Sequence, residues 1–573
     1  MQRHLKPLRR VFSIAMLAAM AFLFLDFGHA VPPSWFHTLT WLQFVPSLFQ
    51  FFHTLGQGLA VSAYGFVVIG VLSLLFGRVY CSFLCPLGIL KDLLAWFSAK
   101  VRPKKLRLRF VPPHTKLRYG LLLLVCLSLF SGSLFLLNLL EPFGNFGRFF
   151  SDLFRPAYML SNNLLARLFE ALGSYALYPV AIAKTNPYAL LIPVGMLALV
   201  VSLAVKRGRL YCNTVCPVGT LLGLFSKVAL YQIRFDVEGC NQCGDCVFSC
   251  KAQCIELKNK KVDFSRCVAC GNCLRACSKN GIRYSFAFAP RPKKAKEKAA
   301  PKAASAPPAL TQATSAQPMS AKQASAQQAL TQQALTQHSP GAEGVPRRFV
   351  LSALSMAALG GLSKACAQSC GRKKGEACET GCGNVAFVAT RAATPPGSLG
   401  WKHFSAACTA CHLCVSACPS GVLKPSFLEY GFGGMMQPFM DFGAGFCNYE
   451  CTRCTEVCPT GALLPLTVEK KLSTQIGIVR FERENCVVVT EGTSCGACSE
   501  LCPTQAVRMV PYEGALTLPE LNTDICIGCG ACEYACPTIP YKAIVVDGLL
   551  EHQKAEKPKT EKLETKPLED FPF

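Results

Sequence analysis

Cysteine spacing constrains this chain more than any other feature of its sequence. Four groups of four cysteines lie between residues 408 and 536, and each group ends in Cys-Pro. Two groups follow C-x2-C-x2-C-x3-C-P, and the other two lengthen only the first gap. The groups are Cys408, Cys411, Cys414 and Cys418; Cys447, Cys451, Cys454 and Cys458; Cys486, Cys495, Cys498 and Cys502; and Cys526, Cys529, Cys532 and Cys536. Three thiolates on one tight loop suit a 4Fe-4S cube, while the fourth cysteine, turned away by its proline, reaches a neighbouring cube.

Two alternatives account for this pattern less well. Zinc is satisfied by two C-x2-C pairs and gives no reason for a third cysteine at the next step. Residues 408–412 also contain the C-x-x-C-H pattern of haem attachment, but Cys414 and Cys418 continue the ferredoxin spacing through it. We therefore expect 4Fe-4S clusters and no haem. The spacing leaves two pairings open: Cys418 could serve the cube of the second motif, or the four motifs could interleave, the first with the fourth and the second with the third.

Two further groups precede these four, and neither ends in proline. They are Cys240, Cys243, Cys246 and Cys250, and Cys267, Cys270, Cys273 and Cys277, with Lys251 and Ser278 in the place of proline. The pair predicts one bacterial-ferredoxin module, in which Cys277 completes the cube of the first group and Cys250 that of the second. Cys254 is left over. About six cubes are expected in all.

The composition requires a search for membrane segments. Hydrophobic residues make up 51% of the 573 residues and the mean hydropathy is +0.30. Apolar runs long enough to cross or nearly cross a bilayer occupy residues 11–27, 58–76, 119–140 and 187–205. The segment 28–57 has no Lys or Arg, whereas basic residues precede the first run and follow the second and fourth. The positive-inside rule then predicts a cytoplasmic N-terminus and a cytoplasmic segment 206–346. This topology explains the net charge of +25 better than nucleic-acid binding does.

An internal repeat follows two of these runs. Residues 80–90 read YCSFLCPLGIL and residues 211–221 read YCNTVCPVGTL. Their two C-x3-C-P pairs are expected at one depth on the cytoplasmic side, where four thiolates form a candidate metal or redox site. The alternatives are redox-active dithiols or merely buried thiols. The four cysteines are Cys81, Cys85, Cys212 and Cys216.

Candidate proton acceptors for a quinol are His37, His53 and Glu141, although interfacial polar residues are the simpler interpretation. No histidine falls inside an expected membrane helix, which disfavours a buried b-type haem. No Gly-rich dinucleotide fingerprint occurs in a strand-helix context, so NAD(P)H use is not indicated. No catalytic side chain is expected beyond cluster ligands and these acceptors.

The expected organisation is an α-helical four-span membrane domain followed by small α/β (α+β) modules of the bacterial-ferredoxin type. The membrane domain covers 1–234 and the dicluster module 235–286. A disordered Ala/Gln/Ser/Pro linker covers 287–346 and a twin-arginine signal-like segment 347–367. A connector with Cys370, Cys378 and Cys382 covers 368–400, the four-cluster module 401–550 and a disordered charged tail 551–573. Cys366 lies within the signal-like segment.

On these motifs the chain resembles a fusion of two protein types. Residues 1–286 resemble the NapH/MauN type, which has four helices, two C-x3-C-P motifs and a dicluster ferredoxin tail. Residues 347–550 resemble the NapG/MauM type, which has a twin-arginine signal and four cluster motifs, including an elongated third one like that of Cys486 and Cys495. The fusion itself, Lys251, Ser278, the long linker and the cysteines from 366 to 382 depart from these patterns.

The resemblance implies a quinol dehydrogenase module of the bacterial inner membrane, with its C-terminal module in the periplasm. It would pass electrons from the quinone pool, or from a cytoplasmic donor, to a periplasmic reductase or a cytochrome c-type acceptor. Whether nitrate, nitrous oxide or another system is served stays open. The alternative function is maturation of a metal centre, in which the C-x3-C-P cysteines hold or reduce a metal such as copper.

Overall fold

The computed structural model describes residues 5–26, 28, 30–54, 64–101, 109–182, 185–236, 239–279, 281–288 and 385–556. By internal contacts, all of these described residues fall within one compact unit. Residues 289–384, with most of the expected linker, the twin-arginine-like segment and Cys366, Cys370, Cys378 and Cys382, lie outside the described ranges.

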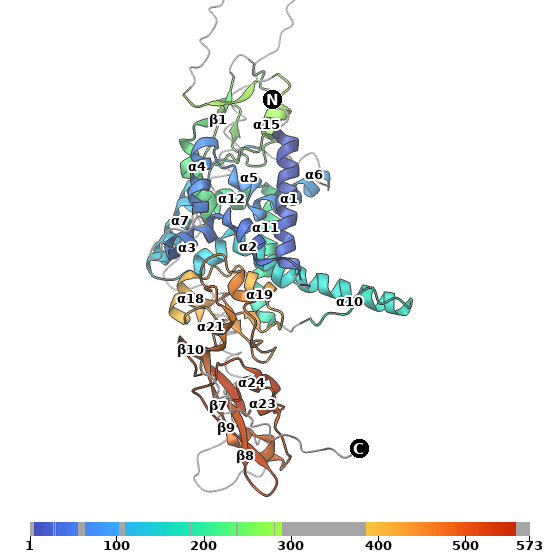
Figure 1. Ribbon diagram of the computed structural model, residues 1–573. Helices are drawn as coiled ribbons and strands as arrows, with labels where there is room; N and C mark the ends of the chain where they lie inside the picture. Colours follow the sequence, from blue (N-terminus) through green and yellow to red (C-terminus); the bar gives the residue numbers. More distant parts are fainter. Residues whose placement is uncertain are drawn as a thin grey trace, which may run out of the picture. The chain divides into compact units, whose positions relative to one another are not determined.

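The first part of this unit is helical (Figure 1). Its helices are α1 (Leu5–Leu25), α2 (Pro33–Trp41), α3 (Phe44–Thr54), α4 (Gly65–Phe76), α5 (Tyr80–Phe83), α6 (Pro86–Val101), α7 (Thr115–Phe130), α8 (Phe135–Leu140), α9 (Pro142–Arg148), the π-helix η3 (Phe149–Phe154), α10 (Arg155–Ala171), α11 (Pro187–Arg207), α12 (Leu210–Thr214) and α13 (Pro217–Lys227). We call residues 5–227 the helical part.

Two described helices are long and apolar enough to cross a membrane, at residues 7–25 and 187–207. They match the first and fourth expected spans. The second expected span is described only from residue 64 onward, as the 12-residue apolar helix α4. Two spans are therefore supported by length, and the four-span topology stays a prediction.

The third expected span, 119–140, is not one continuous helix. Helix α7 ends at Phe130, and Gly132 adopts a left-handed φ of +78°. The amide of Gly132 donates to the Leu129 carbonyl and that of Ser133 to the Ser128 carbonyl. This is the Schellman arrangement that stops a helix at glycine. Helix α8 restarts at Phe135, so two short helices replace the expected span.

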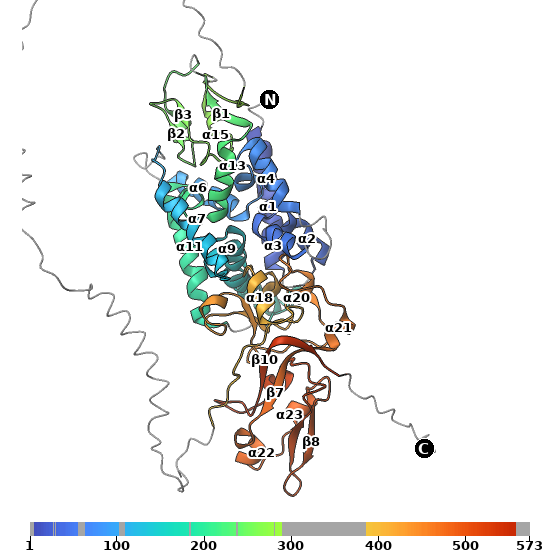
Figure 2. The same cartoon turned by 90° about the vertical axis from the view of Figure 1, so that its left-hand side faces the viewer.

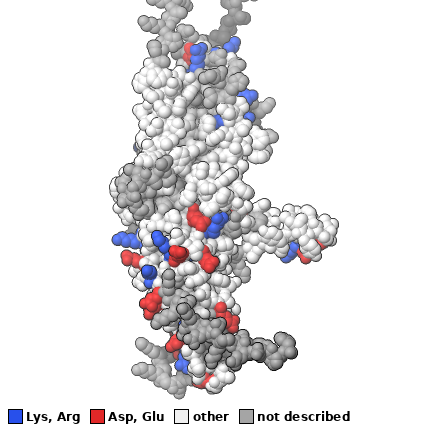
Figure 3. All heavy atoms as spheres, viewed as in Figure 1, with Lys and Arg blue, Asp and Glu red and all other residues white. Residues whose placement is uncertain are grey.

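The segment 28–57, which has no Lys or Arg, contains the two helices α2 and α3. Pro33 lies in the first turn of α2, where a backbone amide has no partner within the helix. Proline has no amide hydrogen, so it leaves no donor unpaired at this position. Much of the helical part exposes large apolar side chains, among them Phe12, Val67, Leu123 and Leu164. The face shown in Figure 3 is correspondingly sparse in charge over these helices, and an exposed apolar surface of this kind favours contact with a membrane.

The dicluster module follows the helical part. Its elements are β1 (Tyr231–Phe235), α14 (Asp245–Phe248), β2 (Ile255–Glu256), β3 (Lys261–Val262), α15 (Asn272–Ala276) and β4 (Ile282–Phe286). Strands β1 and β4 pair antiparallel with Ile233 opposite Tyr284, and β2 pairs with β3. The strand β1 begins at Tyr231, so the module starts four residues before the expected boundary at 235.

The third part, residues 385–556, is the C-terminal module (Figure 2). Its elements are α18 (Trp401–Ala407), α19 (Leu413–Ala417), β5 (Leu423–Pro425), η4 (Phe432–Gly434), β6 (Pro438–Met440), α20 (Arg453–Glu456), α21 (Val468–Leu472), β7 (Thr474–Phe481), η5 (Arg483–Asn485), α22 (Val487–Thr490), α23 (Ala497–Glu500), β8 (Val507–Pro511), β9 (Thr517–Leu521), α24 (Ala531–Ala535) and β10 (Ile544–Lys554). Strand β10 pairs antiparallel with β7, β5 with β6 and β8 with β9.

Both boundaries of the C-terminal module differ from the expected 401 and 550. Strand β10 continues to Lys554, because Gln553 and Lys554 pair with β7. Upstream, the amide of Gly548 donates to the Arg391 carbonyl, and that of Met440 to the Ala393 carbonyl. Residues 391–400 therefore belong to the module and not to a separate connector.

Candidate iron-sulfur and thiol sites

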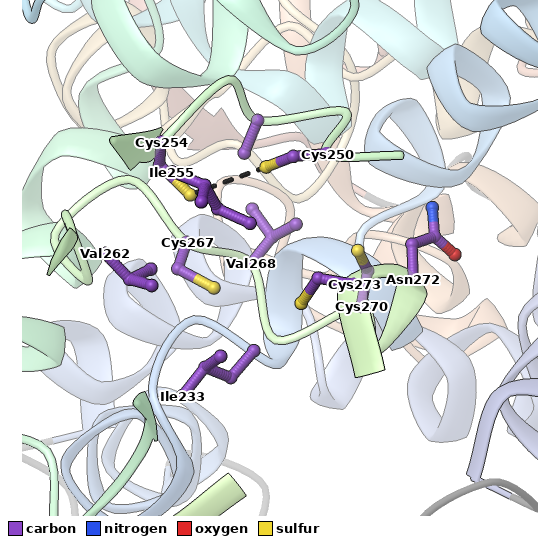
Figure 4. A pocket seen from close by; sticks show the side chains of 11 residues that line it. Ile233, Cys250, Cys254, Ile255, Val262, Cys267, Val268, Cys270, Asn272 and Cys273 are labelled. Atoms are coloured by element: carbon purple, nitrogen blue, oxygen red, sulfur yellow. Dashed lines mark hydrogen bonds between the residues drawn. The ribbon is translucent and has the colours of Figure 1, made fainter. Parts of the chain in front are cut away.

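One cavity of the dicluster module gathers a complete predicted ligand set. Cys250, Cys267, Cys270 and Cys273 all line it, together with apolar side chains such as Ile233 (Figure 4). This is the crossed set expected from the spacing. In the other group, Cys240, Cys243 and Cys277 lie close enough to Cys246 to interact with it electrostatically.

Cys254 is a fifth thiol in the same cavity. Its sulfur lies 3.7 Å from that of Cys250, and only 1% of the residue is exposed. The hydrogen bond with Cys254 is the main reason that the pKa of Cys250 falls to about 7. The position four residues after the last motif cysteine is Val422, Ala462 and Ala506 in three other groups. The sequence therefore signalled Cys254 only as a surplus cysteine.

Within the described part of the C-terminal module, each of three cavities is lined by four cysteines. The sets are Cys408, Cys411 and Cys414 with Cys458; Cys418 with Cys447, Cys451 and Cys454; and Cys486, Cys495 and Cys498 with Cys536. Cys502 interacts electrostatically with the remaining three, Cys526, Cys529 and Cys532. The fourth cysteines are thus exchanged between the first and second motifs and between the third and fourth. The interleaved alternative does not agree with these cavities.

The third motif departs from the single tight loop that the cysteine spacing predicted. Cys486 directly precedes α22, and this short helix occupies much of the elongated gap before Cys495. Cys495 and Cys498 nevertheless line the same cavity as Cys486, and both Cys495 and Cys486 interact electrostatically with Cys498. The expectation of one loop is therefore wrong for this motif, because its ligands come from two elements. Ligation of a cube by Cys495 stays a prediction.

The chemistry of these cavities fits a thiolate-bound cofactor. Burial raises the pKa of Cys498 and of Cys529 to about 12, so four free thiolates together are unfavourable there. A bound metal cofactor supplies the positive charge that would stabilise them. Each of the three cavities is lined by four cysteines, the number of thiolates that bind a 4Fe-4S cube.

The tight cluster loops share one backbone conformation. The residue before the second cysteine and the residue after it both have positive φ. The second of these positions is glycine in three loops, Gly244, Gly271 and Gly530, but His412 in the fourth, with φ of 63°. A side chain there carries a conformational cost, which indicates that His412 has a compensating contact.

His412 makes that contact with the helical part. Its Nδ1 lies 2.9 Å from both carboxylate oxygens of Asp152 in η3, and its Nε2 lies 2.8 Å from the carbonyl of Met436. The side chains of His412 and Asp152 are only 1% and 3% exposed. The haem-like C-x-x-C-H pattern therefore contains a histidine whose two ring nitrogens both have protein partners.

Helices α8 and α9 lie directly against the same cluster loop. Arg148 donates to the carbonyl of Ala410 at 3.2 Å, and Asn138 donates to the carbonyl of Cys408 at 3.2 Å. A Cβ atom at Gly147 would collide with the carbonyl oxygen of Cys411. Glycine at this position therefore permits the close approach.

The four C-x3-C-P cysteines are gathered from both repeats. Each is at most 6% exposed, and Cys85 interacts electrostatically with Cys81, Cys212 and Cys216. The amide of Gly88 donates to the sulfur of Cys85 at 3.4 Å, and that of Gly219 to the sulfur of Cys216 at 3.3 Å. We call Cys81, Cys85, Cys212 and Cys216 the thiol quartet.

Two arginines outside the predicted site residues connect the two repeats by hydrogen bonds. Arg78 donates to the carbonyl of Cys212 at 2.8 Å, and Arg209 donates to the carbonyl of Cys81 at 2.6 Å. Each arginine stands three residues before the first cysteine of its own repeat. The signal was the longer repeat G-R-x-Y-C, which precedes both C-x3-C-P pairs.

The three candidate quinol residues lie in different settings. Glu141 is 1% exposed, and its carboxylate accepts from the amides of Phe143 and Gly144 at the start of α9. His37 is exposed on α2. His53 belongs to α3, but its side chain is outside the described part of the structure. Capping of α9 is a sufficient reason for a buried carboxylate at Glu141.

The cavities and motifs define a ferredoxin-type iron-sulfur protein of electron transport. Family models agree: a 4Fe-4S binding domain matches residues 60–105 and 188–237, and a 4Fe-4S dicluster domain matches residues 492–539. The chain is related to the ferredoxin-type proteins NapH and MauN. It is 29% identical over 200 residues to the ferredoxin-type protein NapH of Escherichia coli, and 27% identical over 191 residues to the methylamine utilization ferredoxin-type protein MauN of Paracoccus denitrificans.

These likenesses cover only part of the chain. Each alignment spans 33% or 32% of this chain and 53% of NapH or MauN. An uncharacterized protein of Methanocaldococcus jannaschii is 28% identical over 226 residues, which are 39% of this chain and 79% of that protein. No solved structure matches the chain.

Proposed function

We propose that the chain is a membrane-bound electron carrier of the quinol dehydrogenase type. It takes electrons from quinol, or from a cytoplasmic donor, and delivers them to a periplasmic reductase or a cytochrome c-type acceptor. The twenty-four cysteines of the six groups hold about six 4Fe-4S cubes, which supply one-electron transfer when bound. The protein positions the cubes and keeps water from the buried thiolates.

One observation carries this proposal: the two cysteine modules contact opposite ends of the same apolar helix, α11. At its start, the rings of Tyr188 and Phe427 lie 6.0 Å apart, so this end touches the C-terminal module. Just beyond its end, the amide of Arg209 donates to the carbonyl of Lys251 in the dicluster module. A 21-residue helix is about 30 Å long, close to the thickness of a bilayer core.

Helix α1 supports the same arrangement. Near its start, Arg9 pairs at 3.4 Å with Asp92, which also pairs at 3.5 Å with Lys251 of the dicluster module. Beyond its end, the carbonyl of Val31 accepts from Arg453 of the C-terminal module at 3.3 Å. Both membrane-length helices are thus linked at one end to the dicluster module, α1 through Asp92, and at the other end to the C-terminal module, which supports a carrier that joins the two sides of a bilayer. With the dicluster module in the cytoplasm, the C-terminal module would be periplasmic.

The test is anaerobic purification of the full chain in detergent, followed by addition of a reduced menaquinone analogue. We expect about 24 cube iron atoms per chain and reduction of cubes seen by electron paramagnetic resonance. Zinc in place of iron, or cubes that dithionite reduces but quinol does not, would overturn the quinol assignment. Protease treatment of spheroplasts that carry an epitope after Phe573 tests on which side of the membrane the C-terminal module lies. Cleavage of the epitope by external protease is expected. Protection of the epitope, while a control protein on the outer side is cleaved, would contradict a periplasmic C-terminal module.

The alternative is maturation of a metal centre by the thiol quartet. The gathering of four thiols from two repeats favours some metal or redox role for them. In a maturation protein, serine at Cys81 and Cys212 would deplete metal in the partner enzyme while quinol still reduced the cubes. In an electron carrier, the same serine variants would instead stop electron delivery to the partner enzyme, while that enzyme kept its full metal content.

A further inference from the structure

We propose that α10 and the segment after it form an arm that lies in the outer surface of the membrane, with lipid covering its apolar face. We call residues 155–182 the arm. The inference rests on the membrane location in the proposed function and adds a partner for one surface. The family models match residues 60–105, 188–237 and 492–539, so they do not include the arm.

The arm extends away from the neighbouring helices. In Figure 1, α10 leaves the helical part across the direction of α1. After α10 ends, Gly173 adopts a left-handed φ of +75°. Asn162 then donates to the carbonyl of Tyr178 at 3.0 Å, and Asn163 donates to the carbonyl of Val180 and accepts from its amide. The returning segment is therefore fixed along one side of α10.

Another side of α10 presents a row of leucines. The row has one leucine every four residues, which places its members on one face of the helix. These residues, Leu160, Leu164, Leu168 and Leu172, are 63%, 70%, 56% and 74% exposed. On the opposite side, Met159 and Ala166 are buried. An apolar row left open to water is unfavourable and marks an interaction surface.

The charges of the arm lie to one edge of this row. In the sequence from 156 to 182, the charged residues are Arg167 and Glu170 alone. Figure 3 shows charge on the edge of the arm toward the C-terminal module, whereas the edge toward the helical part is white. A helix with an apolar face and a polar edge lies in the plane of a membrane surface, with its apolar face toward the acyl chains.

The arm begins at the depth where a membrane-length helix ends. Arg155, the first residue of α10, interacts electrostatically with Asp26, which directly follows α1. The preceding helix η3 joins the C-terminal module through Asp152 and His412. The start of the arm is therefore at the boundary between the part that the proposed function places in the bilayer and the module that it places in the periplasm. The outer headgroups lie at this depth.

Lipid fits this surface better than a protein partner does. The uncharged edge of the arm is directed toward the helical part (Figure 3), so a protein seated there would itself have to occupy the bilayer. The returning segment also exposes Tyr175 and Tyr178. Tyrosine rings are enriched at the membrane-water interface, because they have an apolar body and a polar hydroxyl.

The consequence concerns the first cluster loop of the C-terminal module. Helix η3 connects the arm directly to His412 of that loop. An arm held in the outer leaflet would therefore keep this loop at a constant height above the bilayer.

The test is photocrosslinking of the full chain in vesicles of phosphatidylethanolamine and phosphatidylglycerol. Leu164→p-benzoylphenylalanine places a photoreactive group on the leucine row, and Arg167→p-benzoylphenylalanine places it on the charged edge as a matched control. Mass spectrometry should find lipid adducts at position 164 at least about fivefold more often than at position 167. Absence of lipid adducts at 164, or a crosslink from 164 to a second copy of the chain, would overturn the inference.

A second measurement uses protease and requires no crosslinker. The combined variant Leu160→Asn, Leu164→Asn and Leu168→Asn should release the arm from lipid, so that external proteinase K cleaves it in spheroplasts. The combined control Arg167→Asn and Glu170→Asn should leave the arm as protected as in wild type. Resonance signals of the cubes should persist in both variants, because the changes are at exposed positions. Equal cleavage of the arm in wild type and in the leucine variant would contradict its contact with lipid.

Extraction of membranes with alkaline carbonate separates a failure of this inference from a failure of the proposed function. The chain should remain in the membrane pellet. Its release would refute the membrane-bound carrier itself. Retention of the chain without lipid adducts at position 164 would refute only the contact between the arm and lipid.

Discussion

Asp152 and His412 are hydrogen-bonded at 2.9 Å, although 260 residues separate them in the chain. Asp152 belongs to the helical part and His412 to a cluster loop of the C-terminal module. Because both side chains are buried, removing either partner leaves a polar group without its hydrogen bond. This pair is therefore a sensitive probe of how the two parts are joined.

Asp152→Ala should destabilise that junction by about 2 to 4 kcal/mol, the usual cost of orphaning a buried ionic or hydrogen-bonded partner. The measurement is the thermal midpoint in detergent, together with proteolytic release of the C-terminal module. Glu170→Gln alters an exposed carboxylate on α10 and serves as the control. His412→Gly should release the module too, while its cluster loop keeps the conformation seen at Gly244 and Gly271. Equal stability of Asp152→Ala and Glu170→Gln would show that the contact contributes nothing.

Gly147→Ala should push α9 away from the cluster loop, since its new methyl group meets the carbonyl of Cys411 and the ring of Phe24. Overpacking of this kind costs about 1 to 3 kcal/mol. The matched control is Gly195→Ala in α11, where an added Cβ meets no atom within 4 Å and helix propensity favours alanine. Thermal midpoints should fall in the first variant and hold or rise in the second. The same response in both would contradict the close approach.

Cys458→Ser should affect the cube of a different motif from its own. Cys458 follows the loop of the second motif, but it lines the cavity of Cys408, Cys411 and Cys414. Because each cube has its own environment, its resonance signal can be assigned by comparing variants. Cys458→Ser and Cys411→Ser should therefore perturb one shared signal, whereas Cys451→Ser should perturb another. If Cys458→Ser and Cys451→Ser perturbed the same resonance signal, the exchange of fourth cysteines between the first and second motifs would be refuted.

Cys250→Ser should retain its cube, because the thiol of Cys254 lies 3.7 Å from that of Cys250 and can replace it. Adding Cys254→Ala should abolish that cube, with a loss of about four iron atoms per chain. Cys254→Ala alone should be harmless, since Ala462 and Ala506 occupy the equivalent position.

The control for this rescue is Cys277→Ser. Four residues after Cys277 stands Gly281, which offers no thiol, so this single change should already cost a cube. If Cys250→Ser loses iron as readily as Cys277→Ser does, Cys254 cannot serve as a ligand.

His552→Gln should make the C-terminal module less sensitive to acid. Burial lowers the pKa of His552 to about 4, whereas the unfolded chain binds the proton at its ordinary pKa near 6.5. Between these values the unfolded state holds more protons, so stability falls as the pH drops from about 6.5 to 4. The loss in the free energy of unfolding on acidification should be smaller in the variant by on the order of 1 to 2 kcal/mol. Thermal midpoints at pH 7.5 and 5 measure it, and parallel slopes for both proteins would disprove the effect.

The sequence by itself determined the chemistry of the clusters, since the spacing of cysteines in the regular motifs fixes which thiolates share a loop. It predicted the crossed set of Cys250 with Cys267, Cys270 and Cys273, which line one cavity. It also located the first and fourth membrane-length helices, because apolar runs of that length are visible without any knowledge of contacts.

Three differences between the expected and the observed structure arise from local features of the chain. Gly132 divides the third apolar run, because its left-handed backbone ends α7. The long gap between Cys486 and Cys495 leaves room for α22, so these two cysteines do not share a tight loop. Residues 391–393 and 551–554 join the C-terminal module through backbone pairing, which side-chain composition does not reveal.

Only the tertiary structure decided which motifs exchange their fourth cysteines, and that the two repeats share one thiol quartet. Both facts depend on contacts between residues far apart in the chain, such as Arg78 with Cys212 and His412 with Asp152. Spacing restricts only neighbours along the chain. The pairing of distant loops is set by packing, burial and hydrogen bonding, which exist only once the chain has folded.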